Sequence, residues 1–270
     1  MIENISIIGA GNLAKCFINR LLTYKGKYKI FLYDIDKRQD KYTSIKNVKF
    51  YRSVNQYLSE SQIVFLAIKP HDFKYVSKDI IEYGDKKSIV ISLMAGTKLN
   101  VIDQGLNKDF CTVRMMTNIN AQFGNAQSFI YIKRDFPKNK FNHLVNFLKL
   151  FGDITRVKTE MQMDKLTALC GSGPAYFIYF TEIVKDTFRK FGFKESEAEQ
   201  LSKNLFYSTG YTCYHSNNSM KDIKRTIVSK KGTTEAALVM MDKKNIRKVI
   251  MESIDQAYKK SIQLGKENND

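Results

Sequence analysis

The chain has 270 residues, of which 43% are hydrophobic, a mean hydropathy of −0.34 and a formal net charge of +17. This length accommodates one large or two medium domains, and no apolar run reaches the roughly 20 residues that a membrane-spanning helix needs. We therefore expect a globular protein that makes no use of a membrane.

The start of the chain and its cysteines indicate a cytoplasmic protein. We expect no secretion signal, because the N-terminus opens into a strand rather than into a basic segment followed by an apolar core. The cysteines form no C-x-x-C pair and no cluster with histidine, so we expect reduced thiols and no metal site.

The positive charge raises the alternative of a nucleic-acid partner. Basic patches bind nucleic acids by releasing counterions from phosphates. Here the lysines are spread along the whole chain as singles and pairs, with no basic tail and no zinc-finger spacing. A solvated, lysine-rich surface explains this pattern, so we expect no specific nucleic-acid partner.

The first residues read as strand, glycine turn and helix. The β-branched run Ile5–Ile8 leads into a G-x-G-x-x-A turn, and residues 16–22 are apolar at helical spacing. In such a turn the first glycine allows a sharp bend, the second lets a pyrophosphate approach the backbone, and the small third residue lets the helix pack on the strand. The alternative is a glycine turn without a ligand. We predict a dinucleotide site at Gly9, Ala10, Gly11, Asn12, Leu13 and Ala14.

A carboxylate follows the second expected strand, at 29–33. Asp34 lies 23 positions after Gly11, close to the spacing at which dinucleotide folds place an acid on the adenosine ribose. A carboxylate there accepts hydrogen bonds from a free 2′-hydroxyl and repels a 2′-phosphate, which favours NADH over NADPH. Lys37 and Arg38 leave NADPH open, because either side chain could bind a phosphate.

Strands and helices continue to alternate to about residue 159. We expect further strands at 49–51, 63–68, 88–93, 111–116, 128–132 and 154–157, and helices at 55–59, 99–105 and 141–151. The run at 63–68 is apolar throughout, as in strands buried on both faces of a parallel sheet. These patterns predict an α/β fold with a doubly wound, Rossmann-type sheet as a dinucleotide-binding domain over residues 1–159.

From residue 160 to 270 the apolar residues recur at helical spacing and no strand run is visible. We predict an all-helical second domain over 160–270. Two motifs stand out within it: Gly171–Tyr176, with two glycines and a proline inside a helical stretch, and Ser229–Leu238, with a glycine and two threonines before a helix. The first predicts a kink, a close helix contact or a backbone exposed to a ligand; the second offers free helix N–H groups to an anion. Alone, a kink and a cap without a ligand explain both equally well.

Together these motifs resemble the pyrroline-5-carboxylate reductase family. The turn at Gly9–Ala14, the segment Ile68-Lys69-Pro70, the Ala95-Gly96 loop and the two helical-domain motifs occur in the family's order over nearly the whole chain. The resemblance implies a homodimer or larger oligomer built by the helical domain. It implies transfer of a hydride from NADH or NADPH to the C=N carbon of L-1-pyrroline-5-carboxylate, the small-molecule substrate, to give L-proline, the last step of proline biosynthesis.

The resemblance also assigns roles to residues. Thr234 would hydrogen-bond the ring nitrogen and relay its proton, while the N–H groups of Gly232 and Thr233 and the Ser229 hydroxyl would hold the carboxylate. Asn118, in a loop near the nicotinamide, would contact the substrate. The remaining cofactor contacts that it implies, around the nicotinamide ribose, are Ala67, Ile68, Lys69, Pro70, Ala95 and Gly96.

Three positions depart from the family pattern. In the segment Ser229–Thr234, called the serine turn below, Lys230-Lys231 replaces the Pro-Gly of the family. Arg225 follows Lys224 where the family has an acid. The loop Arg114–Asn120 keeps Asn118 and lacks both prolines. Two rival functions stay open: a dehydrogenase of the β-hydroxyacid type, which would need a lysine in the helix after Gly171–Tyr176, where Lys185 is late, and a non-catalytic dinucleotide- or nucleic-acid-binding protein.

Overall fold

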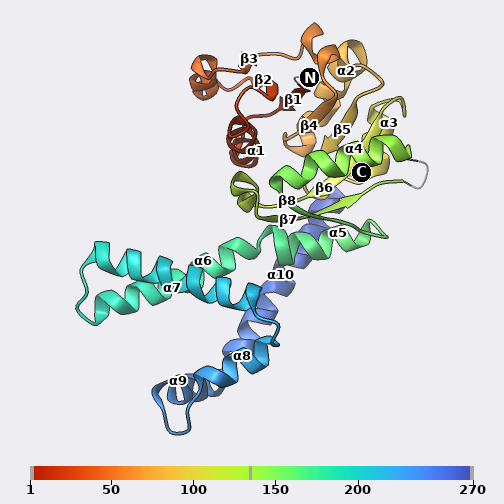
Figure 1. Ribbon diagram of the computed structural model, residues 1–270. Coiled ribbons are helices and arrows are strands. Elements are labelled where there is room, and N and C mark those ends of the chain that lie inside the picture. The colour runs from red at the N-terminus through yellow and green to blue at the C-terminus, as the bar shows by residue number, and fades with distance from the viewer. Residues whose placement is uncertain (1–2, 134–135, 268–270) are drawn as a thin grey trace. The chain divides into compact units, whose positions relative to one another are not determined.

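The computed structural model describes residues 3–133 and 136–267, apart from the side chains of residues 37–40 (Figure 1). The chain forms two compact units: Met1–Ser172 with Ala257–Asp270, and Gly173–Gln256. The first unit thus includes residues 160–172 and the end of the chain, which the sequence assigns to the helical domain. The predicted boundary between residues 159 and 160 stays a prediction.

The first unit is built on one eight-stranded sheet in the order β3-β2-β1-β4-β5-β6-β7-β8. Strands β1 to β6 are parallel, β7 runs antiparallel to β6, and β8 is parallel to β7. The strand order reverses between β1 and β4, the place where open α/β sheets bind their ligands. The predicted doubly wound sheet is therefore confirmed. The strands are β1 (Glu3–Ile8), β2 (Tyr28–Tyr33), β3 (Val48–Tyr51), β4 (Ile63–Leu66), β5 (Ile89–Ser92), β6 (Cys111–Met116), β7 (Ala126–Tyr131) and β8 (Gly152–Arg156).

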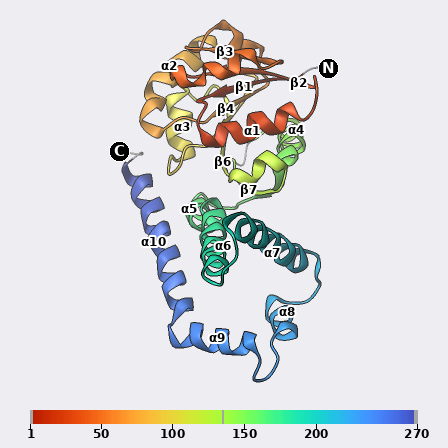
Figure 2. The same cartoon turned by 90° about the vertical axis from the view of Figure 1, so that its left-hand side faces the viewer.

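Helices cover both faces of this sheet (Figure 2). Helices α1 (Asn12–Leu22) and α4 (Lys138–Leu148) pack on one face, where Phe17, Phe65 and Phe151 lie in ring contact with centroids 4.4 to 6.4 Å apart. Helices α2 (Phe73–Tyr83) and α3 (Leu99–Gly105) cover the other face, and the short α5 (Met161–Leu166) follows β8. Burial on both faces explains why the central strands are continuous apolar runs.

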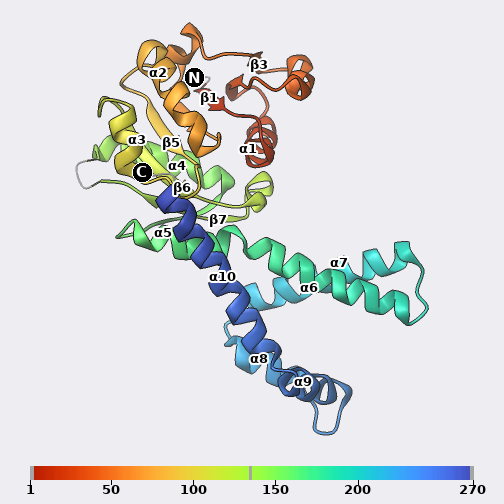
Figure 3. The same cartoon turned by 180° about the vertical axis from the view of Figure 1, so that it is seen from behind.

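The second unit contains helices and no strand. They are α6 (Gly173–Lys190), α7 (Glu195–His215), α8 (Met220–Ile227), α9 (Thr233–Lys243) and α10 (Ile246–Glu267), whose last turns belong to the first unit. Helices α6 and α7 lie side by side (Figure 3), with the rings of Phe177 and Phe206 6.2 Å apart. Only Gly173, Ala198 and Ser202 are buried between residues 173 and 256. This unit therefore has almost no core of its own.

Two predicted elements need correction. The helix expected at 55–59 is a 3-10 turn, Gln56–Glu60, which begins where the Asn55 side chain accepts a hydrogen bond from the Tyr57 N–H at 3.1 Å. The strand expected at 63–68 ends at Leu66, because the chain turns away from the sheet at Ala67. Helix α2 was not among the predicted elements. In the described part of the chain, no helix is both long and apolar enough to cross a membrane.

Candidate functional site

The glycine turn between β1 and α1 has the shape that a phosphate-binding turn needs. Gly9 has a φ of 95°, and a Cβ there would collide with the carbonyl oxygen of Ala67, so both conformation and space require glycine. A Cβ on Gly11 would meet no atom within 4 Å, which leaves the backbone open. No side chain caps the first turn of α1. Its free N–H groups therefore face a space that suits a pyrophosphate.

Asp34 ties this turn to the end of β2. One carboxylate oxygen accepts the N–H of Ala10 at 2.6 Å, and the other accepts the N–H of Asp36 at 2.7 Å. The carboxylate is held in place by the backbone on both sides, so its remaining lone pairs have a fixed direction. The side chains of Lys37 and Arg38, which left NADPH open, lie outside the described residues.

The segment after β4 lies beside the glycine turn. The N–H of Ala67 donates to the carbonyl oxygen of Ile8 at 2.8 Å, and the Ala67 carbonyl lies against Gly9. Lys69 is exposed, and Pro70 begins a 3-10 turn, Pro70–Asp72. The structure thus brings Ala67 and the glycine turn together at the carboxyl edge of the sheet.

The Ala95-Gly96 loop follows β5 and is backed by the end of the chain. Gly96 has a φ of 72°, and a Cβ there would lie 2.8 Å from the backbone nitrogen of Gly265 in the last turns of α10. Two glycine backbones therefore pack directly on each other. Ala95 itself is exposed.

A cavity of about 220 Å³ opens at this carboxyl edge, among the ends of β5 and β6 and the start of α1. It contains Leu13 and Ala95 of the predicted cofactor residues. Apart from the loop Arg114–Asn120 and the motif Gly171–Tyr176, no motif of the sequence marks the other lining residues. They are Leu93, Met94, Arg114, Met115, Met116, Thr117, Thr167 and Gly171.

Arg114, one of the residues that line this cavity, is almost fully buried. Its side chain is 4% exposed and pairs with Glu160 at 3.1 Å and with Asp164 at 3.1 Å. The same Glu160 oxygen accepts the N–H of Leu99 at 2.6 Å. One buried cation thus joins β6 to α5 and to the start of α3, which explains its presence without a ligand.

Asn118, a predicted substrate residue, makes two hydrogen bonds within the protein. Its amide nitrogen donates to the carbonyl oxygen of Cys170 at 2.9 Å, and its side-chain oxygen accepts the N–H of Asn120 at 3.0 Å. A proline at 120 could not donate the second bond, so Asn118 fixes the loop where the prolines are missing. Its contact with the substrate stays a prediction.

The glycine-rich motif Gly171–Tyr176 follows a π-helical turn, Thr167–Gly171, in which the N–H of Ser172 donates to the carbonyl oxygen of Thr167 at 2.9 Å. A Cβ on Gly171 would lie 3.2 Å from the sulfur of Met116, so this motif does make a close contact. Such turns are frequent at functional sites. Here the turn brings Thr167 and Gly171 into the cavity.

The serine turn precedes α9 in the second unit. Gly232 is the N-cap, and its N–H donates to the carbonyl oxygen of Ser229 at 3.0 Å. The N–H of Gly232 is thus bound within the turn, and its predicted contact with the substrate carboxylate stays a prediction. The N–H groups of Thr233 and Thr234 lie in the first helical turn and have no intrahelical acceptor.

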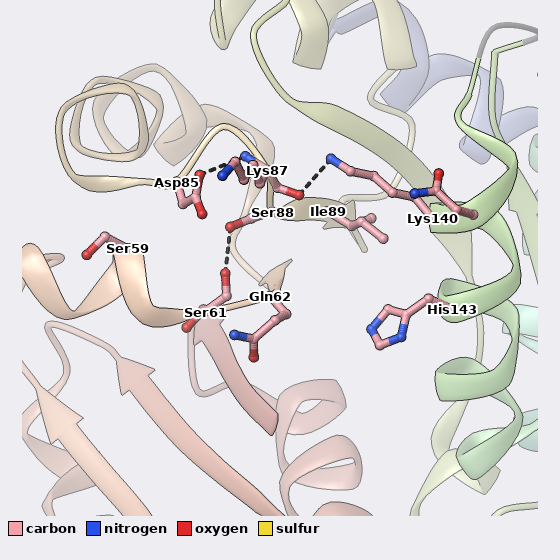
Figure 4. A pocket seen from close by; sticks show the side chains of 10 residues that line it. Ser59, Ser61, Gln62, Asp85, Lys87, Ser88, Ile89, Lys140 and His143 are labelled. Carbon is pink, nitrogen blue, oxygen red and sulfur yellow. Dashed lines mark hydrogen bonds between the residues drawn. The ribbon is translucent and has the colours of Figure 1, made fainter. Parts of the chain in front are cut away.

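Another cavity, of about 290 Å³, lies at the opposite, amino edge of the sheet (Figure 4). Its walls are polar, and the Lys140 ammonium donates to the carbonyl oxygen of Lys87 at 2.7 Å. None of the predicted site residues lines it. It is therefore separate from the carboxyl edge.

Comparison with known proteins gives matches over both parts of the chain. Residues 160–264 match the family model for pyrroline-5-carboxylate reductase dimerisation, and residues 4–96 match that for coenzyme F420-dependent NADP oxidoreductases. A pyrroline-5-carboxylate reductase of Staphylococcus haemolyticus is 30% identical over 267 residues, which cover 96% of each chain.

Solved structures of similar proteins share the fold. A pyrroline-5-carboxylate reductase from Coxiella burnetii matches with a TM-score of 0.84 at 24% identity, over 98% of this chain and 99% of that one. The pyrroline carboxylate reductase of Plasmodium falciparum, solved with NADP bound, matches with a TM-score of 0.87 at 20% identity, over 98% and 100%. A 3-hydroxyisobutyrate dehydrogenase from Mycobacterium tuberculosis reaches only 0.51 at 11% identity, over 72% and 67%.

Proposed function

Since this chain belongs to the pyrroline-5-carboxylate reductase family, we propose that it reduces the C=N bond of L-1-pyrroline-5-carboxylate to L-proline with NAD(P)H. It is an NAD(P)H-dependent oxidoreductase by that membership. The observation that carries the proposal is the 30% identity over 96% of the chain.

The residues at the carboxyl edge fit a dinucleotide. The open space over Gly11 and the uncapped start of α1 would take the pyrophosphate. Asp34 would accept hydrogen bonds from the adenosine ribose, which supports NADH as the preferred reductant. Lys69, Pro70, Ala95 and Gly96 would border the nicotinamide ribose. When bound, the reduced nicotinamide supplies the hydride.

The serine turn would hold the substrate by its carboxylate. The N–H groups of Thr233 and Thr234 and the positive end of the α9 dipole suit an anion, and the Ser229 hydroxyl would add a further donor. Gly232 would contribute by its small size, since a Cβ there would collide with the Ser229 hydroxyl.

The Thr234 hydroxyl would donate a hydrogen bond to the ring nitrogen and relay a proton to it. A cyclic imine accepts a hydride readily once its nitrogen is protonated or hydrogen-bonded, so positioning and one donor account for much of the catalysis. No histidine or lysine base is needed, in contrast to the oxidation of an alcohol.

The dehydrogenase alternative loses its candidate base. Lys185 pairs with Glu195 at 3.5 Å and with Glu199 at 3.8 Å. Its ammonium group is thus engaged by two carboxylates within the helical unit rather than free to act on a hydroxyl. This arrangement favours imine reduction over β-hydroxyacid oxidation.

We also propose a homodimer as the minimum assembly. Most large apolar side chains of α6 to α10 are exposed in the single chain, for example Phe177, Tyr207 and Val249. An apolar surface of this size on one unit is typical of an obligate interface. The match to a dimerisation model over residues 160–264 supports the same conclusion.

Substitution of the proposed hydrogen-bond donor tests the reaction. We expect Thr234→Ala to lower kcat about a hundredfold, the usual contribution of a positioned proton donor. Because Thr234 does not belong to the dinucleotide turn, the Kd for NADH should stay within about twofold of that of the unmodified protein. The measurements are oxidation of NADH and of NADPH with and without the cyclic imine, and fluorescence titration of each cofactor.

Thr187→Ala is a matched control. The Thr187 hydroxyl donates to the carbonyl oxygen of Ile183 at 2.8 Å within α6 and has no proposed role in the reaction. An unchanged kcat in Thr234→Ala would remove Thr234 from the mechanism. If the unmodified protein oxidised neither cofactor with the imine, the proposed reaction itself would be wrong.

A further inference from the structure

The serine turn contains an unusual backbone conformation at Lys231. Its φ is 59°, in the left-handed region that costs an ordinary side chain conformational energy. The other non-glycine residues with positive φ in the described chain are asparagines, which tolerate it, and Lys108. The family pattern has glycine at this position. Some interaction must therefore hold Lys231 in a conformation that glycine would adopt freely.

Glu235 supplies that interaction. Its carboxylate accepts the N–H of Lys231 at 2.6 Å, across one turn at the start of α9. A hydrogen bond to a charged acceptor is stronger than one between neutral groups. Glu235 is half-buried and lies in the first turn of the helix, where the dipole favours a negative charge.

The bond also determines which N–H groups the turn offers. Within the turn, the N–H of Lys231 is bound to Glu235, and that of Gly232 is bound to the Ser229 carbonyl. The first N–H groups left without an acceptor are those of Thr233 and Thr234. If Lys231 left the left-handed region, Gly232 and the start of α9 would rotate with it.

We propose that Glu235 is a positioning residue for the substrate carboxylate: by holding the Lys231 N–H, it keeps the serine turn in the conformation that presents the N–H groups of Thr233 and Thr234. The pair Lys231–Glu235 does here what glycine does in the family turn. This inference rests on the proposed function, since it concerns the binding of that substrate. It gives a role to Glu235, which lies within the motif Ser229–Leu238 but receives no role from the family resemblance.

Steady-state kinetics of Glu235 variants tests the proposal. We expect Glu235→Ala to raise the KM for the imine about tenfold while kcat changes less than about threefold, because binding rather than proton transfer is impaired. Glu235→Gln should stay within about twofold of the unmodified protein, since the amide oxygen still accepts the bond. Glu252→Ala, an exposed glutamate of α10, is the matched control and should leave KM unchanged.

A second variant separates positioning from a general structural effect. We call the hydrogen bond from the Lys231 N–H to Glu235 the clamp. With Lys231→Gly the left-handed conformation no longer needs this clamp, so adding Glu235→Ala in that background should change the KM for the imine less than about threefold. A KM for Glu235→Ala within twofold of the unmodified value would overturn the proposal, and so would an equally large effect in both backgrounds.

Melting temperatures give a readout that needs no substrate. The four proteins to compare are the unmodified protein, Glu235→Ala, Lys231→Gly and the double variant. The clamp requires that Glu235→Ala lowers Tm more with lysine than with glycine at position 231. Additive shifts would overturn it, whatever the activity. If the unmodified protein failed to reduce the imine, the proposed function would fail by itself, and the melting cycle would still decide whether the clamp exists.

Discussion

At the scale of single residues, Asp34 combines a proposed contact with the cofactor and a structural role in the glycine turn. Its distance from Gly11 predicts a contact with the ribose. The structure adds hydrogen bonds from the N–H groups of Ala10 and Asp36, at 2.6 and 2.7 Å. The carboxylate thus supports the glycine turn in addition to its proposed contact with the cofactor.

Because Asp34 has both a structural role and a proposed cofactor contact, Asp34→Ala should affect the two cofactors differently. Loss of hydrogen bonds to a charged acceptor costs about 1.5–3 kcal/mol, so the KM for NADH should rise at least about tenfold. The KM for NADPH should rise less, because the repulsion of the 2′-phosphate disappears together with the support of the turn. The ratio of kcat/KM for the two cofactors measures the effect.

Asp153→Ala, an exposed aspartate in β8, serves as the control for Asp34→Ala. An unchanged ratio of the two cofactors in Asp34→Ala would show that Asp34 supports the turn without contacting the ribose.

At the scale of elements, the last turns of α10 pack on the loop after β5 through two glycines. We predict that Gly96→Ala destabilises the first unit more than Gly26→Ala. Both glycines have nearly the same φ, 72° and 73°, so both substitutions bear the left-handed strain of about 1–2 kcal/mol. Only at Gly96 would the new Cβ also meet backbone, 2.8 Å away at Gly265.

Denaturant unfolding of the two glycine variants measures the difference, and hydrogen exchange of residues 257–267 locates it. Gly26 is the matched control, because a Cβ there meets nothing within 4 Å. Equal losses of stability in the two variants would mean that α10 does not rest on Gly96 in solution.

Local sequence predicts where the strands lie. Each strand overlaps a predicted one, and β6 begins and ends at the predicted residues although its run contains Thr112 and Arg114. The run at β4 is apolar throughout, as burial on both faces of a parallel sheet favours. Helix α2 could have been predicted too, since Phe73, Val76 and Ile80 share one helical face after Pro70. The antiparallel direction of β7 is set by the connection between β6 and β7, which no periodicity records.

The candidate site divides in the same way. The glycine turn and the serine turn have sequence signatures, because only certain residues fit their conformations. No sequence signature tells which N–H groups of the serine turn remain free. In the structure the Gly232 N–H is bound to the Ser229 carbonyl, and the Lys231 N–H is bound to the Glu235 carboxylate. Such bonds depend on the φ of Lys231, a value that no residue type at that position predicts.

At the scale of the whole molecule, the second unit lacks the buried residues that would stabilise it alone. We predict that the protein dimerises and that its melting temperature rises with concentration, because association then contributes to stability. Replacing Tyr207 and Tyr211 together by Glu should shift the dimer toward monomer and lower Tm. Both rings are exposed in the single chain, with centroids 6.0 Å apart on α7.

Sedimentation velocity over a range of concentrations measures the assembly. Tyr75→Glu is the matched control, an equally exposed tyrosine on α2 of the first unit, and should leave the assembly unchanged. A monomeric unmodified protein with a concentration-independent melting temperature would contradict the prediction.

The chain enters the second unit after Ser172 and returns to the first at Ala257. The helical unit is therefore topologically an insertion, anchored through the backbone at both ends. A protease cut between α7 and α8, at residues 216–219, would yield two fragments, and each would keep a segment folded into the first unit. The nicked protein should then migrate as one species under native conditions and separate only on denaturation.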